Sequence, residues 1–205
     1  MSILLNTFET NMFNTKIIEK SSTIILKCCK KDKNFISIMG LFGINEYCMK
    51  VMTKYMNTCH LTILRQNLEI IFYLVSDENN LQFFYKQQNM EVLLKCFLHN
   101  IKTKEIVLLN LKLVSLITTR EFGMNKQQEY DTSMIIEIIN EVMSNYDESL
   151  DIIIQLCELI KNIFKMTNDV WIKKILIDVI FNNSDKYISK QVFTILFLGF
   201  HRTFP

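Results

Sequence analysis

The 205-residue chain contains no alanine, only four glycines and a single proline, Pro205, and it carries a net charge of +2. So little glycine and proline leaves few positions for tight hairpin turns, which argues against a sheet of short strands and favours helices joined by polar turns. The small net charge excludes a general electrostatic attraction to nucleic acid or anionic membranes.

The length suits one compact domain or a short array of repeats, and we expect a single domain over residues 1–205. The N-terminus lacks the basic start and long apolar core of a signal peptide, and no apolar stretch approaches the roughly 20 residues that span a bilayer. The six cysteines fall mostly in apolar helical patterns and form no CxxC pair. These features predict an intracellular protein, cytoplasmic or nuclear, that does not insert into membranes.

Apolar residues at helical spacing predict a series of helices along the chain. The expected ranges are 8–31 (one helix or a pair), 44–56, 60–75, 80–87, 90–99, 104–119, 133–143, 149–166 and 170–181. A short apolar segment, residues 34–39, runs into Gly40 and Gly43, which predict a sharp turn between helices. A second turn is expected at residues 88–89.

The pattern recurs at intervals typical of helical repeats. Asn34 aligns with Asn80 at an offset of 46, and residues 67–68 align with residues 110–111 at an offset of 43. The last helix of the pattern recurs at residues 155–156 and again at residues 191–192. In each copy, three positions spaced i, i+3 and i+7 share one helical face. They are Leu68, Ile71 and Val75; Leu111, Val114 and Thr118; Leu156, Leu159 and Ile163; and Val192, Ile195 and Gly199.

This arrangement resembles the armadillo family, in which a long third helix ends in a short polar turn, followed by a short first helix, a small-residue turn and a leucine-rich second helix. Residues 73–94 supply those features in that order. The resemblance implies an all-α, right-handed, armadillo/HEAT-like α-solenoid. An irregular helical bundle is the alternative. The best repeats are residues 34–79 and 80–120, and the weaker units are residues 1–33, 121–167 and 168–205.

In armadillo proteins of the nuclear-import and catenin kind, a row of asparagines and often a tryptophan line the groove formed by the third helices. The matching positions here are Glu69 and Tyr73, then Ser115 or Leu116, so import-signal binding is not expected. The only tryptophan, Trp171, lies elsewhere. The resemblance implies instead a concave third-helix surface with a different set of exposed partner-binding candidates. They are Arg65, Glu69, Tyr73, Lys112 and Lys161.

No pattern of catalytic or metal-ligating residues is evident, and we expect no enzymatic activity, cofactor or metal. Cys59 and His60 could form a metal site or a nucleophilic pair, but adjacent helical residues do not face each other. A buried cysteine beside a helix-start histidine is therefore the favoured interpretation. His99 and His201 are isolated and are expected at helix ends. The chain has no P-loop, GxGxxG, HExxH or GxSxG motif.

The sequence thus predicts a non-enzymatic adaptor or scaffold that binds a peptide or helix of a partner protein. The alternative is nucleic-acid binding by the basic N-terminal end, where lysines at positions 27, 30, 31 and 33 could contact phosphates. Residues 1–60 carry a net charge of +4 and residues 121–158 a net charge of −8, a contrast that would also allow head-to-tail self-association.

Overall fold

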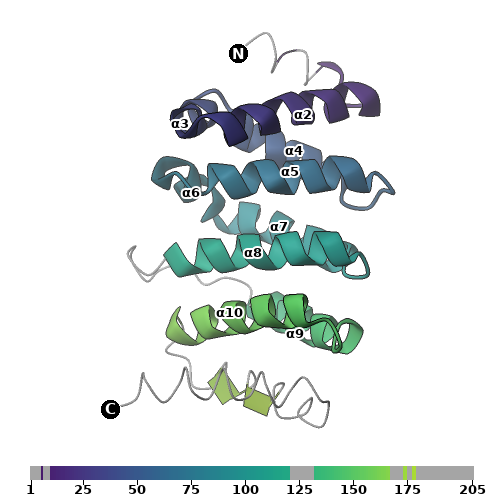
Figure 1. Ribbon diagram of the computed structural model, residues 1–205, viewed down its shortest axis with the longest axis vertical. Coiled ribbons are helices and arrows are strands. Elements are labelled where there is room, and N and C mark those ends of the chain that lie inside the picture. Colours follow the sequence, from purple (N-terminus) through teal and green to yellow (C-terminus); the bar gives the residue numbers. More distant parts are fainter. Residues whose placement is uncertain (1–5, 7–9, 121–131, 167–172, 175–176, 179–205) are drawn as a thin grey trace. The chain divides into compact units, whose positions relative to one another are not determined.

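The computed structural model describes residues 6, 10–120, 132–166, 173–174 and 177–178. Within these residues the protein is all-helical and contains no strand, as the sequence predicts (Figure 1). The chain divides into two compact units, residues 1–100 and 101–205, which we call unit 1 and unit 2. The predicted single domain and the predicted units at the two ends of the chain stay predictions.

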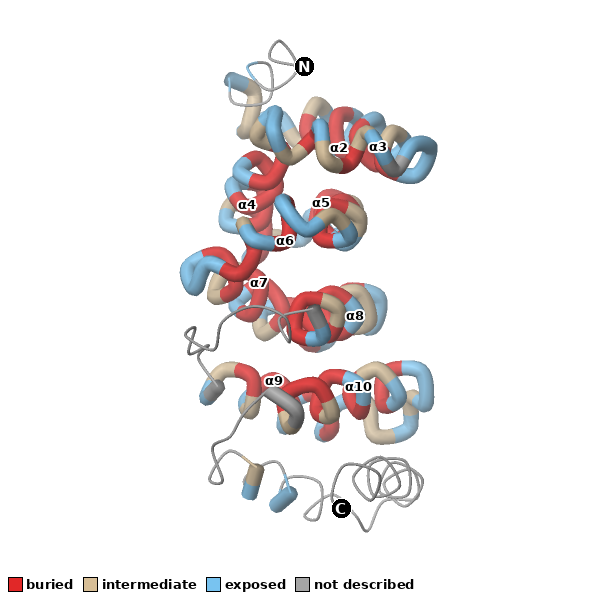
Figure 2. Tube along the Cα trace, turned by 90° about the vertical axis from the view of Figure 1, so that its left-hand side faces the viewer, coloured by how far each residue is buried: buried red, intermediate tan, exposed pale blue. Residues whose placement is uncertain are grey.

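Unit 1 contains six described helices, and each predicted helix that begins in residues 10–100 is present within a few residues of its expected ends. The helices are α2 (Thr15–Lys31), α3 (Lys33–Leu41), α4 (Ile44–Tyr55), α5 (Leu61–Leu74), α6 (Glu78–Phe84) and α7 (Gln87–His99). Apolar residues predicted to face inward on α4 and α6 are buried, among them Val51, Leu81 and Phe84. The buried residues of α2 to α7 form one continuous core (Figure 2).

One predicted turn in unit 1 is wrong. Gln88 and Asn89 do not turn the chain, because α7 already begins at Gln87 and the break after α6 lies at residues 85–86. The Asn89 side chain is buried, and its amide nitrogen donates a hydrogen bond of 2.7 Å to the Phe83 carbonyl oxygen. Asn89, which resembles a turn signal in the sequence, therefore connects the start of α7 to α6 by a hydrogen bond.

The two glycines near the end of α3 have different roles. Gly43 adopts a left-handed conformation, with φ of 79°, and caps the start of α4, which confirms the predicted turn. Gly40 lies inside α3, and a Cβ atom at this position would stand 1.5 Å from Oδ1 of Asn80 in α6. Gly40 is thus required for close packing between α3 and α6 rather than for a turn.

Unit 2 contains three described helices, α8 (Lys104–Arg120), α9 (Thr132–Asn145) and α10 (Leu150–Met166), which agree with three predicted ranges. The most extensive contact is between α8 and α10. Leu111 and Val114 of α8 and Leu156 and Leu159 of α10 are all buried. Residues 121–131, most of the predicted helix at 170–181 and the predicted third helix around Val192 lie outside the described residues, as do Trp171 and His201.

Long helices recur along the chain at regular intervals. The helices α2, α5, α8 and α10 begin at residues 15, 61, 104 and 150, which gives intervals of 46, 43 and 46 residues. Within unit 1, α2 packs most extensively on α5, and in unit 2 α8 packs most extensively on α10. The spacing agrees with the predicted repeat. Stacking of all the units into one solenoid stays a prediction.

Candidate partner-binding surface

The outward face of α5 carries the first three predicted site residues. Leu64, Leu68 and Ile71 face the core and are at most 1% exposed. Arg65 is exposed on the opposite side, whereas Glu69 and Tyr73 are half-buried. The spacing i, i+4 and i+8 places the three on one side of the helix. All three were expected to be exposed, and only Arg65 is.

Glu69 is held by two cations. Its Oε2 atom lies 3.1 Å from Nζ of Lys30 on α2, and its Oε1 atom lies 3.4 Å from a terminal guanidinium nitrogen of Arg65. The side chain of Glu69 is only 20% exposed, compared with 50% for Lys30 and 45% for Arg65. The Glu69 side chain is therefore largely covered, and the outermost charges of this cluster are positive.

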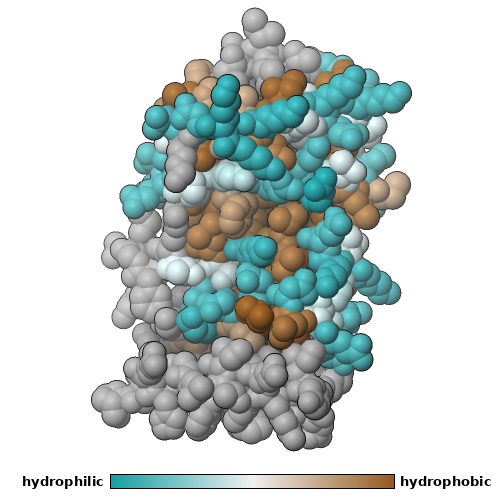
Figure 3. All heavy atoms as spheres, viewed as in Figure 1, coloured by the Kyte–Doolittle hydropathy of each residue, from teal (hydrophilic) through white to brown (hydrophobic). Residues whose placement is uncertain are grey.

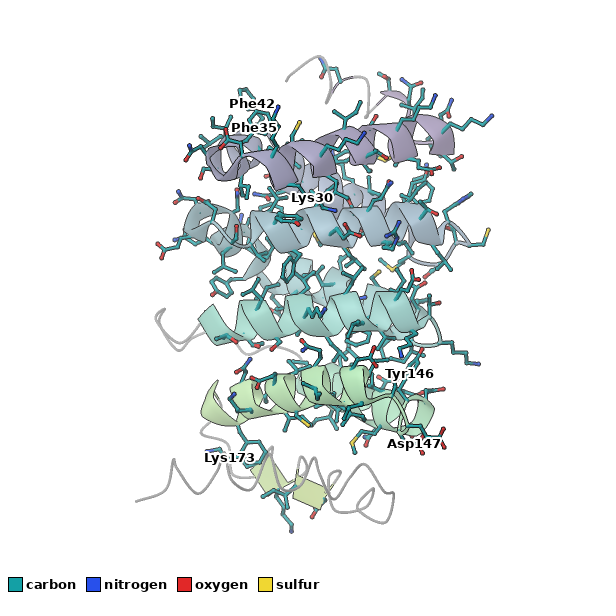
Figure 4. The ribbon with its side chains drawn as sticks, viewed as in Figure 1. Lys30, Phe35, Phe42, Tyr146, Asp147 and Lys173 are labelled. Atoms are coloured by element: carbon teal, nitrogen blue, oxygen red, sulfur yellow. The ribbon has the colours of Figure 1, made fainter. Side chains whose placement is uncertain are left out.

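The same two helices are joined by a neutral hydrogen bond. The side-chain amide of Gln66 donates to the Thr23 hydroxyl at 2.9 Å. Together with the ion pair to Lys30, it fixes the alignment of α2 and α5, and Figure 4 shows Lys30 between these helices. Exposed ion pairs contribute only about 0–1 kcal/mol each. The surface is thus held in place mainly by the apolar contacts beneath it.

Aromatic side chains lie at the end of this surface. Phe72 is 36% exposed, and its ring meets that of Tyr73 edge-to-face, with 6.2 Å between ring centroids. Aromatic and arginine side chains supply much of the binding energy at protein interfaces. We call Thr23, Lys30, Arg65, Glu69, Phe72 and Tyr73 the α2–α5 surface.

The remaining predicted site residues lie in unit 2. Lys112 is exposed on α8, and Lys161 is half-buried on α10, where its Nζ atom lies 2.8 Å from the Glu158 carboxylate. A second ion pair, 3.1 Å between Lys104 and Asp151, connects α8 to α10. A hydrogen bond from the Ser149 hydroxyl and the charge of Lys104 lower the pKa of Asp151. Lys112 and Lys161 thus lie on neighbouring helices of one unit.

Lys30 and Phe72 were missing from the residues predicted to form this site. Lys30 was predicted only as part of a basic helix end, because a single sequence does not show which residue of α2 stands beside Glu69. One signal was available: α2 begins 46 residues before α5, which is close to the predicted repeat interval.

The aligned asparagines serve the core rather than an open groove. Asn67 and Asn110 are fully buried. The amide of Asn67 donates to the Cys48 carbonyl oxygen of α4 at 2.8 Å, and that of Asn110 donates to the Ile106 carbonyl oxygen within α8 at 3.0 Å.

The structure corrects one expectation about Cys59, which is exposed rather than buried. His60 stands at the start of α5, as predicted, and its ring packs edge-to-face on Tyr55, with centroids 5.7 Å apart. His99 ends α7, also as predicted, and its Nδ1 atom lies 2.8 Å from the Lys95 carbonyl oxygen. Among the described residues, no group of three histidine, cysteine or acidic side chains is placed to hold a metal ion.

All six cysteines lie in the described part of the chain, and none forms a disulfide there. Burial raises the pKa of Cys29, Cys96 and Cys157 to about 12 and also raises that of Cys48. These thiols are protonated at neutral pH and are poor nucleophiles.

Comparison of the chain with protein-family models, with curated proteins and with solved structures found no match. In the described residues, no helix is both long and apolar enough to cross a membrane.

Proposed function

We propose that this protein is a non-enzymatic interaction adaptor whose α2–α5 surface binds a peptide or helix of a partner protein. The strongest support is the outward face of α5, which carries Phe72 and Tyr73 together with the Glu69 carboxylate that Lys30 and Arg65 already neutralise. The armadillo-like arrangement of repeated long helices and an intracellular location are part of the same proposal.

The composition of the surface favours a polar partner with an apolar anchor. Either Lys30 or Arg65 can exchange its contact with Glu69 for a carboxylate of the partner while the other cation keeps Glu69 paired, so no isolated charge is desolvated. Phe72 and Tyr73 supply apolar area at low entropic cost because their side chains have few rotatable bonds.

A charge swap tests the surface while keeping the ion pair between α2 and α5. In the double variant Lys30→Glu with Glu69→Lys, opposite charges still face each other between these helices, but their positions are exchanged and Arg65 loses its acidic partner. When each protein is used to capture partners from its native cells, we expect the variant to capture at least tenfold less of each partner than the wild-type protein does, as measured by quantitative mass spectrometry.

A matched control uses the ion pair on α7. Glu91 and Lys95 form an exposed pair of 2.5 Å away from the α2–α5 surface, so the swap Glu91→Lys with Lys95→Glu should leave capture unchanged. Circular dichroism and thermal unfolding show whether both variants remain folded. Equal capture by a folded Lys30/Glu69 variant and the wild type would contradict the assignment of this surface.

A further inference from the structure

The outward side of α2 carries a row of lysines. Lys16, Lys20, Lys27 and Lys31 are all exposed, and their spacing places them within a narrow arc of the helix, opposite the buried residues of α2. The row extends over about 22 Å at the rise of an α-helix. Glu19, the only acidic residue of α2, is also exposed but lies to one side of the row.

Apolar side chains project near the lysines. Ile24, within the same exposed side of α2, is 52% exposed. On α3, Ile38 is 42% exposed and Phe42, directly after the helix, is 45% exposed, while Leu41 is 86% exposed. Figure 4 shows Phe42 together with Phe35 at the outer edge of α3, and Figure 3 shows hydrophilic and hydrophobic side chains interleaved at this end of unit 1.

The lysines and the apolar side chains face the same side of unit 1. The opposite side of α3 rests on α6, where the Ser37 hydroxyl donates to Asp77 and Asn80 donates to the Ile36 carbonyl oxygen. Likewise, α2 buries its other side mainly against α5. The two helices lie together at one end of unit 1 (Figure 2). We call this the outer face, formed by Lys16, Lys20, Ile24, Lys27, Lys31, Ile38, Leu41 and Phe42.

We propose that the outer face binds the surface of membranes that contain anionic lipids. The lysines match the negative charge of lipid headgroups, and clusters of four or more basic residues on one face are typical of proteins that bind such lipids. The projecting aliphatic side chains can enter the boundary between headgroups and acyl chains. Nucleic acid could engage the lysines and stack on Phe42, but Ile24, Ile38 and Leu41 offer its phosphates nothing and cannot stack on bases as aromatic rings do. This membrane contact is independent of partner binding by the α2–α5 surface.

Vesicle flotation with the full chain tests this inference. We expect the protein to float with vesicles of phosphatidylcholine containing about a third phosphatidylserine, a composition chosen to give a strongly negative surface. It should not float with pure phosphatidylcholine. Raising the salt concentration from roughly 0.1 M to roughly 0.5 M, which shortens the screening length by about half, should release it. Binding to both kinds of vesicle, or to neither, overturns the proposal.

Two variants separate charge from apolar contact. Lys20→Glu with Lys27→Glu should weaken binding to the anionic vesicles at least tenfold. The control Lys86→Glu with Lys102→Glu, which changes the net charge equally at exposed lysines that are not part of the outer face, should change it less than threefold. Equal losses in these two variants would show attraction by net charge alone and would contradict a specific face.

A variant with fewer exposed apolar side chains distinguishes binding to lipid from binding to other polyanions. Ile24→Ser with Leu41→Ser should weaken vesicle binding several-fold while leaving binding to a DNA duplex unchanged. If this variant binds vesicles as well as the wild type does, or if the wild type binds the duplex more tightly than the vesicles, the outer face is a nucleic-acid or general polyanion site and the lipid assignment is wrong. Circular dichroism confirms that each variant is folded.

Discussion

Buried asparagines connect helices at the scale of single residues. Besides Asn67, the amide of Asn100 donates to the Met56 carbonyl oxygen at 3.0 Å, and that of Asn80 donates to the Ile36 carbonyl oxygen at 2.9 Å. In unit 2, Asn162 of α10 donates to the Ser115 carbonyl oxygen at 3.1 Å and to the Thr119 hydroxyl at 2.6 Å. The sequence does not predict this role, because asparagine is usually exposed and buried only where a partner is available.

Replacement of Asn162 by alanine tests one of these connections. The variant leaves polar groups of α8 without their partner, which should lower the free energy of unfolding by about 1–3 kcal/mol. Asn140, exposed on α9, provides the control, and Asn140→Ala should change stability by less than about 0.5 kcal/mol. Urea unfolding followed by circular dichroism measures both, and equal effects would contradict a structural role for Asn162.

Gly40 is expected to tolerate no side chain while Asn80 is present. In Gly40→Ala the new methyl group would meet Asn80 Oδ1, which accepts a hydrogen bond from Asn45 at 3.1 Å, so we expect a loss of about 1–3 kcal/mol. A double-mutant cycle with Asn80→Ala isolates this clash, because removing the amide should make Gly40→Ala much less costly. Strictly additive effects would show that the two residues do not interact.

The thiols should differ sharply in reactivity. At pH 8 we expect a thiol reagent to modify exposed Cys59 quickly and half-buried Cys28 more slowly, leaving Cys29, Cys48, Cys96 and Cys157 unmodified until the protein unfolds. Rapid modification of all six thiols would contradict the packing.

Burial of Cys96 should also make stability depend on pH. Because burial raises the pKa of Cys96 to about 12, its thiol stays protonated in the folded protein at pH values where the same thiol ionises in the unfolded chain. The free energy of unfolding should therefore fall as the pH rises above about 9, and Cys96→Val should reduce that slope.

At the scale of helices, the sequence predicts which helices are present better than it predicts where each helix begins and ends. Val51 and Leu81 follow apolar patterns that only a buried helical face explains, and both are buried. The start of α6 was predicted two residues late because Asp77 acts as its cap, with Oδ1 accepting from the Asn80 amide nitrogen at 3.0 Å. In the candidate surface, the i, i+4 pair of Arg65 and Glu69 was predictable, whereas Lys30 was not, since its place beside Glu69 depends on packing between helices.

Asp77 should contribute more than an ordinary cap. It also accepts a hydrogen bond of 2.5 Å from the Ser37 hydroxyl of α3, so Asp77→Ala removes a contact between helices as well as the cap. We expect a loss of about 1–2 kcal/mol, near the upper end for such substitutions. Asp77→Asn keeps an acceptor at the cap and should cost less. Thermal unfolding of the two variants measures the difference, which should vanish if capping and the Ser37 contact are unimportant.

At the scale of the whole molecule, the repeated spacing of the long helices is the main regularity. Their intervals of 46, 43 and 46 residues are close to the offsets found in the sequence. The helix lengths are less regular, because α5 has 14 residues and α2, α8 and α10 have 17 each. The arrangement of unit 1 relative to unit 2 depends on contacts that a single-sequence pattern does not encode. The proposed solenoid and its ligand are therefore predictions that extend beyond this regularity.

The most direct test of partner binding is hydrogen exchange of the full chain with and without a captured partner. If the partner binds the α2–α5 surface, hydrogen exchange of the backbone amides in α2 and α5 should slow by at least tenfold. The protected segments should include Lys30, Arg65 and Tyr73. Exchange in α7, which carries the control ion pair, should be unchanged. Protection confined to other helices, with α2 and α5 exchanging as in the free protein, would contradict the proposed surface.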